Sequence, residues 1–302
     1  MEKMNFYMLV AGTMTMAVAG GFYIWYVLAQ GVLRRSVSAK MANTAGGTSN
    51  VTMMEQVKQP RHPAAIYAQV INWVGLIFLG LAVFARWMAV GHAPYSNQYE
   101  FGTAFTFSIV LLGLLLMRQF RQPVLGAFVA PVAVAMGIYV LTLPANLRVV
   151  NPLIPALQNP ILTIHVGVAI LAYGIFAIAF AAAVMYLLQR DGEQRRTWLP
   201  SRLILDDIGY RSVLIGFPLM ILVLVLGGIW ANIAWGAFWS WDPKETAALA
   251  TTLCYGVYLH AHSLKSWSGN RSAWLLILGF AFTIFTFFGN YFLGGLHTYG
   301  GV

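Results

Sequence analysis

Residues 161–188 have the sequence ILTIHVGVAILAYGIFAIAFAAAVMYLL, without a single Lys, Arg, Asp or Glu. A helix needs about twenty mostly apolar residues to cross a hydrocarbon core of about 30 Å, so this run is long enough to span a membrane with tilt or overhang. One histidine, His165, interrupts it near its start. Because ionisable residues inside membrane segments are costly, His165 is a candidate functional residue.

The whole chain has the composition of a polytopic membrane protein. Of its 302 residues, 59% are hydrophobic and 9% are charged, and the mean hydropathy is +0.71, which excludes an ordinary soluble globule. We predict an all-α fold of about eight transmembrane helices. They are expected at roughly 5–30, 66–90, 101–117, 123–142, 161–188, 212–232, 245–263 and 272–293.

The distribution of Lys and Arg predicts the orientation. Fourteen of the 18 cations fall in every second connection, which the positive-inside rule assigns to the cytoplasm. Both termini are then expected on the outer, periplasmic or lumenal side, with the first apolar run kept as an uncleaved helix. The net charge of +9 is explained by cytoplasmic loops that face anionic membrane lipid, so no nucleic acid partner is expected.

Two parts are expected along the chain. Residues 1–65 form the first transmembrane helix and a cytoplasmic linker, whose stretch 36–60 has a flexible composition. Residues 66–302 form the main transmembrane bundle. In that bundle the connection 143–160 contains four prolines, which oppose a continuous helix, and we expect it to form a structured cover over the outer surface.

Several function classes lack support in the sequence. Cys254 is the only cysteine and falls inside an apolar run, so dithiol exchange and Cys-rich metal sites are excluded. No spacing typical of a Ser-His-Asp hydrolase, a Walker loop or a dinucleotide site is present.

The connection 235–245, WGAFWSWDPKE, combines four large aromatic residues with three charged ones. Aromatic rings at a membrane surface commonly only anchor at headgroup level, but this density favours a platform for a large flat ligand, with haem as the leading candidate. The aromatic residues are Trp235, Phe238, Trp239 and Trp241, and the charged ones are Asp242, Lys244 and Glu245.

Two histidines are expected on the same side of the membrane as this connection. His165 begins the inward-running fifth helix roughly 8 Å from its outer end, and His297 follows the outward-running eighth helix. Two neutral imidazoles presented to a flat macrocycle make a six-coordinate haem site. Alternatively, His165 is an interfacial histidine with a local hydrogen bond, and His297 is a solvated tail residue.

A third histidine, His260, is expected about 22 Å inward of Glu245 and so cannot share an iron with the other two. Either another subunit supplies a second ligand to an inner haem, or His260 is hydrogen-bonded between helices. Arg148 and Lys244 are the outer cations expected to pair with propionates, with Arg86 as a third candidate. Asp242 and Glu245 are more simply explained as caps of the seventh helix. The remaining histidines are interpreted as boundary residues: His62, His92 and His262.

These residues carry a family resemblance. The run WGAFWSWDPKET at 235–246 resembles the tryptophan-rich signature of haem-handling proteins in cytochrome c maturation, and most closely that of the CcsA or ResC family. Three further pieces agree with it, namely SNQYE at 96–100, YLH at 258–260 and GLHTYG at 295–300. The resemblance extends over roughly residues 95–300.

The resemblance implies a subunit of a holocytochrome c synthase that exports haem b and presents it on the outer face for thioether attachment to apocytochrome c, which carries a CxxCH motif. It implies that His165 and His297 are the axial ligands, that Trp235 to Asp242 hold the porphyrin, and that His260 binds an inner haem with a partner residue from a CcsB or ResB subunit. The implied location is the bacterial cytoplasmic membrane or the thylakoid membrane. The alternatives are a haem chaperone or exporter without ligase activity, and a structural membrane subunit.

Overall fold

The computed structural model describes residues 1–44, 62–150, 152–192, 195–264, 267 and 269–297, and this part of the chain is helical without a β-strand. Eight long helices follow one another, with three short 3₁₀ turns between them: η2 (Pro123–Leu125), η3 (Ala145–Leu147) and η4 (Pro155–Leu157). The long helices are α1 (Glu2–Thr44), α2 (Pro63–Val90), α3 (Gln98–Phe120), α4 (Gly126–Thr142), α5 (Pro160–Leu188), α6 (Arg202–Trp235), α7 (Pro243–Ser263) and α8 (Asn270–Leu293).

The predicted all-α membrane fold is confirmed. Seven of the helices described are long and apolar enough to cross a membrane. The exception is α7, which is 21 residues long but contains Lys, Glu, Thr and His residues that lower its hydropathy. The predicted number of eight spans, and the orientation of the termini, therefore stay predictions.

Two helices are much longer than predicted. The first was expected to end at residue 30 but continues to Thr44, and the sixth was expected to begin at 212 but begins at Arg202. An apolar run marks the part of a helix that contacts lipid, whereas the helix itself continues until a breaker or a cap ends it. The Ser201 side chain accepts from the backbone N–H of Ile204 and caps α6 at its true start. The rest of the predicted linker, 45–61, lies outside the described residues.

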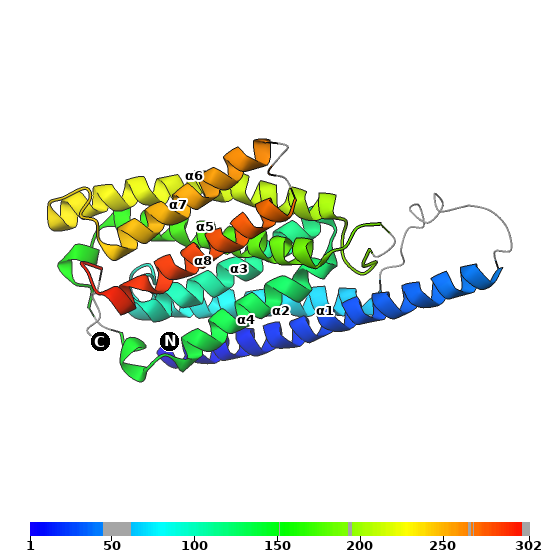
Figure 1. The fold of residues 1–302 in the computed structure, drawn as a ribbon. Coiled ribbons are helices and arrows are strands. Elements are labelled where there is room, and N and C mark those ends of the chain that lie inside the picture. Colours follow the sequence, from blue (N-terminus) through cyan, green and yellow to red (C-terminus); the bar gives the residue numbers. More distant parts are fainter. Residues whose placement is uncertain (45–61, 151, 193–194, 265–266, 268, 298–302) are drawn as a thin grey trace.

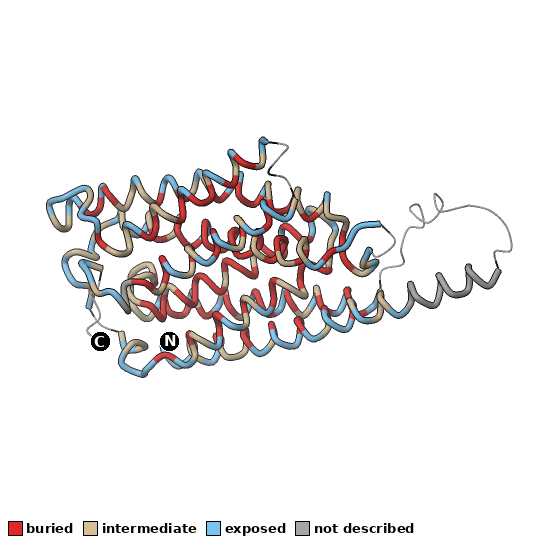
Figure 2. The backbone as a smooth tube through the Cα atoms, viewed as in Figure 1, coloured by how far each residue is buried: buried red, intermediate tan, exposed pale blue. Residues whose placement is uncertain are grey.

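The helices pack as one elongated bundle, in which α1 extends beyond the others at one end (Figure 1). The helix α5 contacts α3, α6 and α8, and α1 packs on α2 and α4. Small residues of α5 such as Ala172, Ala177 and Ala182 are fully buried, which allows its neighbours to approach closely. Buried positions accordingly line the middle of the bundle, and exposed ones lie on its outside (Figure 2).

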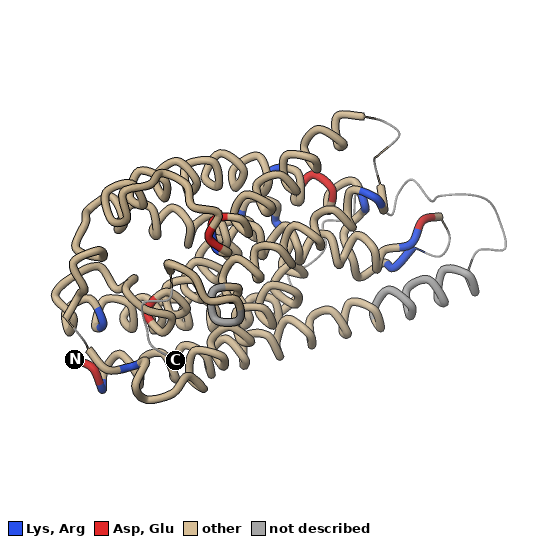
Figure 3. The backbone as a smooth tube through the Cα atoms, turned by 60° about the vertical axis from the view of Figure 1, so that its left-hand side comes forward, with Lys and Arg blue, Asp and Glu red and all other residues tan. Residues whose placement is uncertain are grey.

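The N-terminus of α1 and the C-terminal end of α8 lie at the same end of the bundle (Figure 1). Long stretches of helix carry no charge, and the charged residues lie mainly toward the helix ends (Figure 3). The connections that follow α2, α4 and α6 meet at one end, since residues from all three line a common cavity. This arrangement brings together Tyr95 and Trp239, which are 144 residues apart in sequence.

Candidate functional site

A cavity of about 510 Å³ lies where α3 and α7 begin and α6 ends. Its wall includes residues of α5, α6 and α7, together with Tyr95 to Gln98 at the start of α3. Residues 146–147, 152–154 and 157 also line it, so the proline-containing connection covers the cavity. We call residues 143–150 and 152–159 the cover segment and this space the main cavity. Its volume falls in the range of about 300–1,000 Å³ that is typical of ligand sites.

His165 lines the main cavity from α5. Its Nδ1 atom lies 3.0 Å from the carbonyl oxygen of Val223 on α6, and an N–H donated to this acceptor leaves Nε2 with its lone pair. The next turn of α6 carries Gly227, where a Cβ atom would lie 2.8 Å from Cε1 of His165. Glycine is therefore needed at 227 to let the imidazole lie against the helix.

His297 lines the same cavity from the segment after α8. Its Nδ1 atom lies 2.7 Å from Oδ2 of Asp242, whose side chain is only 1% exposed. The other oxygen, Oδ1, accepts the backbone N–H of Leu296 at 2.6 Å. The intervening Gly295 has a φ of 116°, which strongly favours glycine, and a Cβ there would overlap Oδ1 of Asp242.

The pKa values of this pair favour a neutral imidazole beside a carboxylate. Burial lowers the pKa of His297 below its ordinary value, against the opposing effect of its hydrogen bond to Asp242. Burial alone would raise the pKa of Asp242, but hydrogen bonds from His297 and from the backbone N–H groups of Lys244 and Leu296 outweigh it and lower that pKa. A neutral imidazole is the form that ligates a metal.

Asp242 also caps α7, as predicted. Its side chain accepts from the backbone of the first turn, and the Glu245 side chain accepts the backbone N–H of Asp242, which together make a capping box. Glu245 further accepts from the backbone N–H and the hydroxyl of Ser240. The two carboxylates thus fix the end of the aromatic connection, and through Asp242 they also fix His297.

The four aromatic residues of the connection have different positions. Trp239 lines the main cavity, and Trp235 contacts the His297 ring edge-on with 4.9 Å between centroids. Phe238 packs over Gly228 of α6 but is 51% exposed. Trp241 is 70% exposed and packs edge-on against Trp239. The structure therefore brings Trp239 to the cavity wall and Trp235 against His297, and leaves Phe238 and Trp241 largely at the surface.

Sequence reasoning missed Trp230, which the apolar run of α6 concealed. Its side chain is 2% exposed, lines the main cavity and contacts both Trp235 and His297. The indole Nε1 donates to the carbonyl oxygen of Ala156 in the cover segment at 2.9 Å. Its spacing of five residues from Trp235 was the available signal, but an aromatic residue near the end of a transmembrane helix is too common to be diagnostic.

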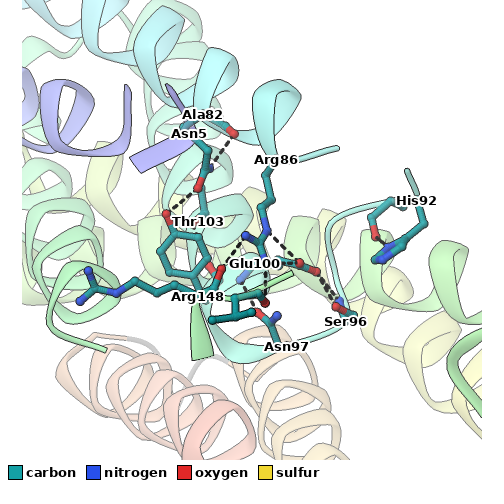
Figure 4. Close-up of polar contacts among 12 residues, drawn as sticks. Asn5, Ala82, Arg86, His92, Ser96, Asn97, Glu100, Thr103 and Arg148 are labelled. Atoms are coloured by element: carbon teal, nitrogen blue, oxygen red, sulfur yellow. Dashed lines mark hydrogen bonds and ion pairs between the residues drawn. The ribbon is translucent and has the colours of Figure 1, made fainter. Parts of the chain in front are cut away.

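Of the three candidate cations, only Lys244 lines the main cavity. The Arg148 guanidinium donates to the carbonyl oxygens of Leu141 and Leu143 at the end of α4 and lies over the Phe6 ring. Arg86 is buried in an ion pair with Glu100 (Figure 4). Neither arginine lines the cavity, and both have protein partners, which sequence position could not reveal.

His260 lies elsewhere, at an open and almost wholly apolar groove that α6 and α7 form. The side chain is exposed, and the groove of about 530 Å³ also includes Phe217, Val257 and Trp267. The other histidines make local contacts. His62 caps α2, His92 contacts the carbonyl oxygen of Ala93, and His262 pairs with Asp206.

Comparison with known proteins shows the family of this chain. Residues 95–297, which include every element of the main cavity, match the family described as cytochrome c assembly protein. The chain belongs to this family. Among curated members, it is 34% identical to the cytochrome c biogenesis protein CcsA of Guillardia theta, over 74% of this chain and 82% of that protein. CcsA of Prochlorococcus marinus subsp. pastoris is also 34% identical, over 78% of this chain and 83% of the relative.

A solved structure gives an independent view of the fold of this cytochrome c assembly protein. The cytochrome c haem lyase CcmF superposes with a TM-score of 0.60 at 16% identity, over 93% of this chain. The chain spans 46% of the length of that protein, so the likeness concerns the fold alone. Family membership and the CcsA relatives place the chain in cytochrome c maturation.

Proposed function

We propose that this protein binds haem b as its substrate in the main cavity, between His165 and His297, and presents it to apocytochrome c for thioether attachment. One observation carries the proposal. Two histidines from distant parts of the chain line the same cavity, and each has its Nδ1 atom engaged by an acceptor, Val223 O for one and Asp242 Oδ2 for the other. Such outer partners orient histidine ligands of metals and raise their basicity, so Nε2 of each is the ligating atom.

The aromatic residues in and behind the wall suit a porphyrin. Trp230 and Trp239 line the cavity, and Trp235 packs edge-on against the His297 ring. Lys244 provides a cation for the propionates, and we no longer assign that role to Arg148 or Arg86, since both have other partners. In the bond-forming step each cysteine S–H of apocytochrome c adds across a haem vinyl group, so this chain has to position haem rather than supply a nucleophile.

We further propose an inner haem site at His260. The exposed histidine at an open apolar groove is suited to a ligand shared with another membrane subunit, and a CcsB or ResB protein is the proposed partner. In this scheme haem enters near His260 and is exported to the main cavity on the outer face. The membrane is the bacterial cytoplasmic membrane, or the thylakoid membrane in a plastid.

The axial assignment is tested by the visible spectrum of the purified protein with His165→Ala, His297→Ala and the matched control His92→Ala. We expect both cavity variants to lose the low-spin haem spectrum and cytochrome c assembly, because iron loses a strong-field ligand. The control, at a histidine outside the cavity wall, should keep both. A double variant that retained an unchanged spectrum would show that the ligands are elsewhere.

A different measurement distinguishes covalent attachment of haem to apocytochrome c from delivery of haem alone. Protein loaded with haem is mixed with reduced apocytochrome c peptide that carries a CxxCH motif, and the covalent product is detected by mass. Formation of the thioether by the complex supports a synthase. Haem transfer without covalent product would assign the chain to delivery alone.

A further inference from the structure

Arg86 of α2 is fully surrounded by protein although it carries a permanent charge, with 2% of its side chain exposed. Its Nε and Nη2 atoms both lie 2.9 Å from Oε1 of Glu100, a carboxylate that is 1% exposed. A buried ion pair is stable only if all remaining donors and acceptors are also satisfied. The partners of those remaining atoms therefore indicate what the pair holds in place.

The second oxygen of Glu100 holds the connection that precedes α3. Oε2 accepts the backbone N–H of Ser96 at 2.8 Å and its hydroxyl at 2.7 Å. Asn97 caps the helix by accepting the backbone N–H of Glu100 at 2.9 Å. The motif SNQYE at 96–100 is thus a folded unit organised around the Glu100 side chain (Figure 4).

The remaining donors of Arg86 hold the cover segment. Nη1 donates to the carbonyl oxygen of Arg148 at 2.7 Å, and Nη2 contacts that of Val149 at 3.3 Å. Figure 4 shows Arg86 between Glu100 and the Arg148 backbone, while the Arg148 side chain extends in another direction. That side chain joins the end of α4, so the cover segment is attached at both its start and its middle.

Both segments that Arg86 and Glu100 join are walls of the main cavity. Ser96, Asn97 and Gln98 line it from one side, and Asn146 and Leu147 line it from the cover segment. Neither Arg86 nor Glu100 lines the cavity itself. The pair therefore acts on the cavity only through the segments that it holds.

We propose that Arg86 and Glu100 are positioning residues that clamp the cover segment against the start of α3 and thereby set how fast haem enters and leaves the main cavity. The proposal rests on the proposed function only for the identity of the ligand. Because Arg86 is buried and its charge is compensated by all of these hydrogen bonds together, we expect the cover segment to be released as a unit when the ion pair is broken. Loss of the clamp should leave the axial histidines in place, because His165 and His297 are anchored by Val223 and Asp242 instead.

The test compares Glu100→Gln with Asp207→Asn, which neutralises the carboxylate of the exposed pair Arg211–Asp207 elsewhere in the bundle. Both changes are made in a Cys254→Ser, Leu147→Cys background, so that one half-buried thiol reports on the cover segment. We expect maleimide labelling of Cys at 147 to become about tenfold faster with Glu100→Gln and to be unchanged with Asp207→Asn. Equal labelling rates in the two proteins would overturn the clamp.

A second readout uses haem. Transfer of bound haem to excess apomyoglobin should also be about tenfold faster with Glu100→Gln, while the low-spin spectrum before transfer is unchanged. If Glu100 only stabilised the fold, Glu100→Gln would lower both the intensity of the low-spin haem spectrum and the yield of purified protein. If Glu100→Gln does not accumulate, Ser96→Ala replaces it, since this change removes one hydrogen bond to Glu100 and keeps the ion pair. The rate of thiol labelling is then expected to rise about fivefold. An unchanged labelling rate contradicts the proposal.

The two proposals fail in different ways. If the main cavity does not bind haem, the parent protein lacks the low-spin spectrum while thiol labelling still reports on the clamp. If Arg86 and Glu100 do not clamp the cover segment, the low-spin haem spectrum is present and the rate of maleimide labelling does not depend on the charge at position 100.

Discussion

His297 Nδ1 lies 2.7 Å from Oδ2 of Asp242, the same residue that caps α7. One carboxylate thus joins the start of a helix to a histidine 55 residues later in the chain. The aromatic connection and the candidate axial ligand are therefore a single structural unit, rather than two features that happen to lie on one side of a membrane.

Replacing this carboxylate by an amide should weaken haem binding without unfolding the helix. Asn caps helices about as well as Asp, so Asp242→Asn should cost only tenths of a kcal/mol in helix stability. The loss of the charged acceptor for His297 is expected to lower haem affinity by about 10- to 100-fold and to raise the midpoint potential of bound haem, because a less basic imidazole stabilises ferric iron less. Haem titration and potentiometry measure both.

Glu245→Gln is the matched control for this prediction. It alters the capping box while leaving the hydrogen bond between Asp242 and His297 intact. An equal change in potential in both variants would show that the cap, not the histidine contact, is responsible.

Gly227→Ala should disturb His165 selectively. The added Cβ would lie 2.8 Å from Cε1 of the imidazole, and overpacking of this kind costs about 1–3 kcal/mol, equivalent to about a 5- to 150-fold loss of haem affinity. Gly167→Ala on α5, where the added Cβ meets nothing within 4 Å, should leave the affinity unchanged. Equal haem affinities in the two purified variants would refute the prediction.

Trp230→Phe should weaken the attachment of the cover segment to α6. The change removes the indole N–H that donates to Ala156 O, a part-buried hydrogen bond whose loss costs about 0.5–1.5 kcal/mol. We expect a lower thermal midpoint in detergent and faster haem release. Trp274→Phe, at a side chain that is 61% exposed on α8, is the control and should leave both quantities unchanged.

His260→Ala should lower the total haem bound per complex when the chain is purified with its partner subunit, since the inner site loses the ligand that His260 supplies. His262→Gln, two residues away on the same helix and paired with Asp206, should keep full loading. Haem content is measured by the pyridine haemochrome method. Unaltered loading in His260→Ala would remove the inner site from the scheme.

Much of the fold was predictable from local sequence. Each transmembrane helix is long, apolar and separate, and a bilayer requires every backbone group to be satisfied within its own helix, so element type follows from hydropathy. The predicted end of α1 and the predicted start of α6 were wrong, because the apolar run marks where a helix contacts lipid and not where the helix itself begins or ends. The predicted helix directions likewise put His165 and His297 at the same end of the bundle as the aromatic connection, and both histidines line the main cavity with Trp239.

The sequence by itself thus determined an all-helical membrane protein, the residues that carry its family signature and the cap of α7 by Asp242. Only the tertiary structure decided which of those residues meet. It brought Trp230 into the cavity wall, engaged Arg148 with the end of α4, and buried Arg86 against Glu100. The physical reason is that hydropathy depends on each residue alone, whereas a buried charge or a ring contact depends on partners from distant helices, which only packing brings together.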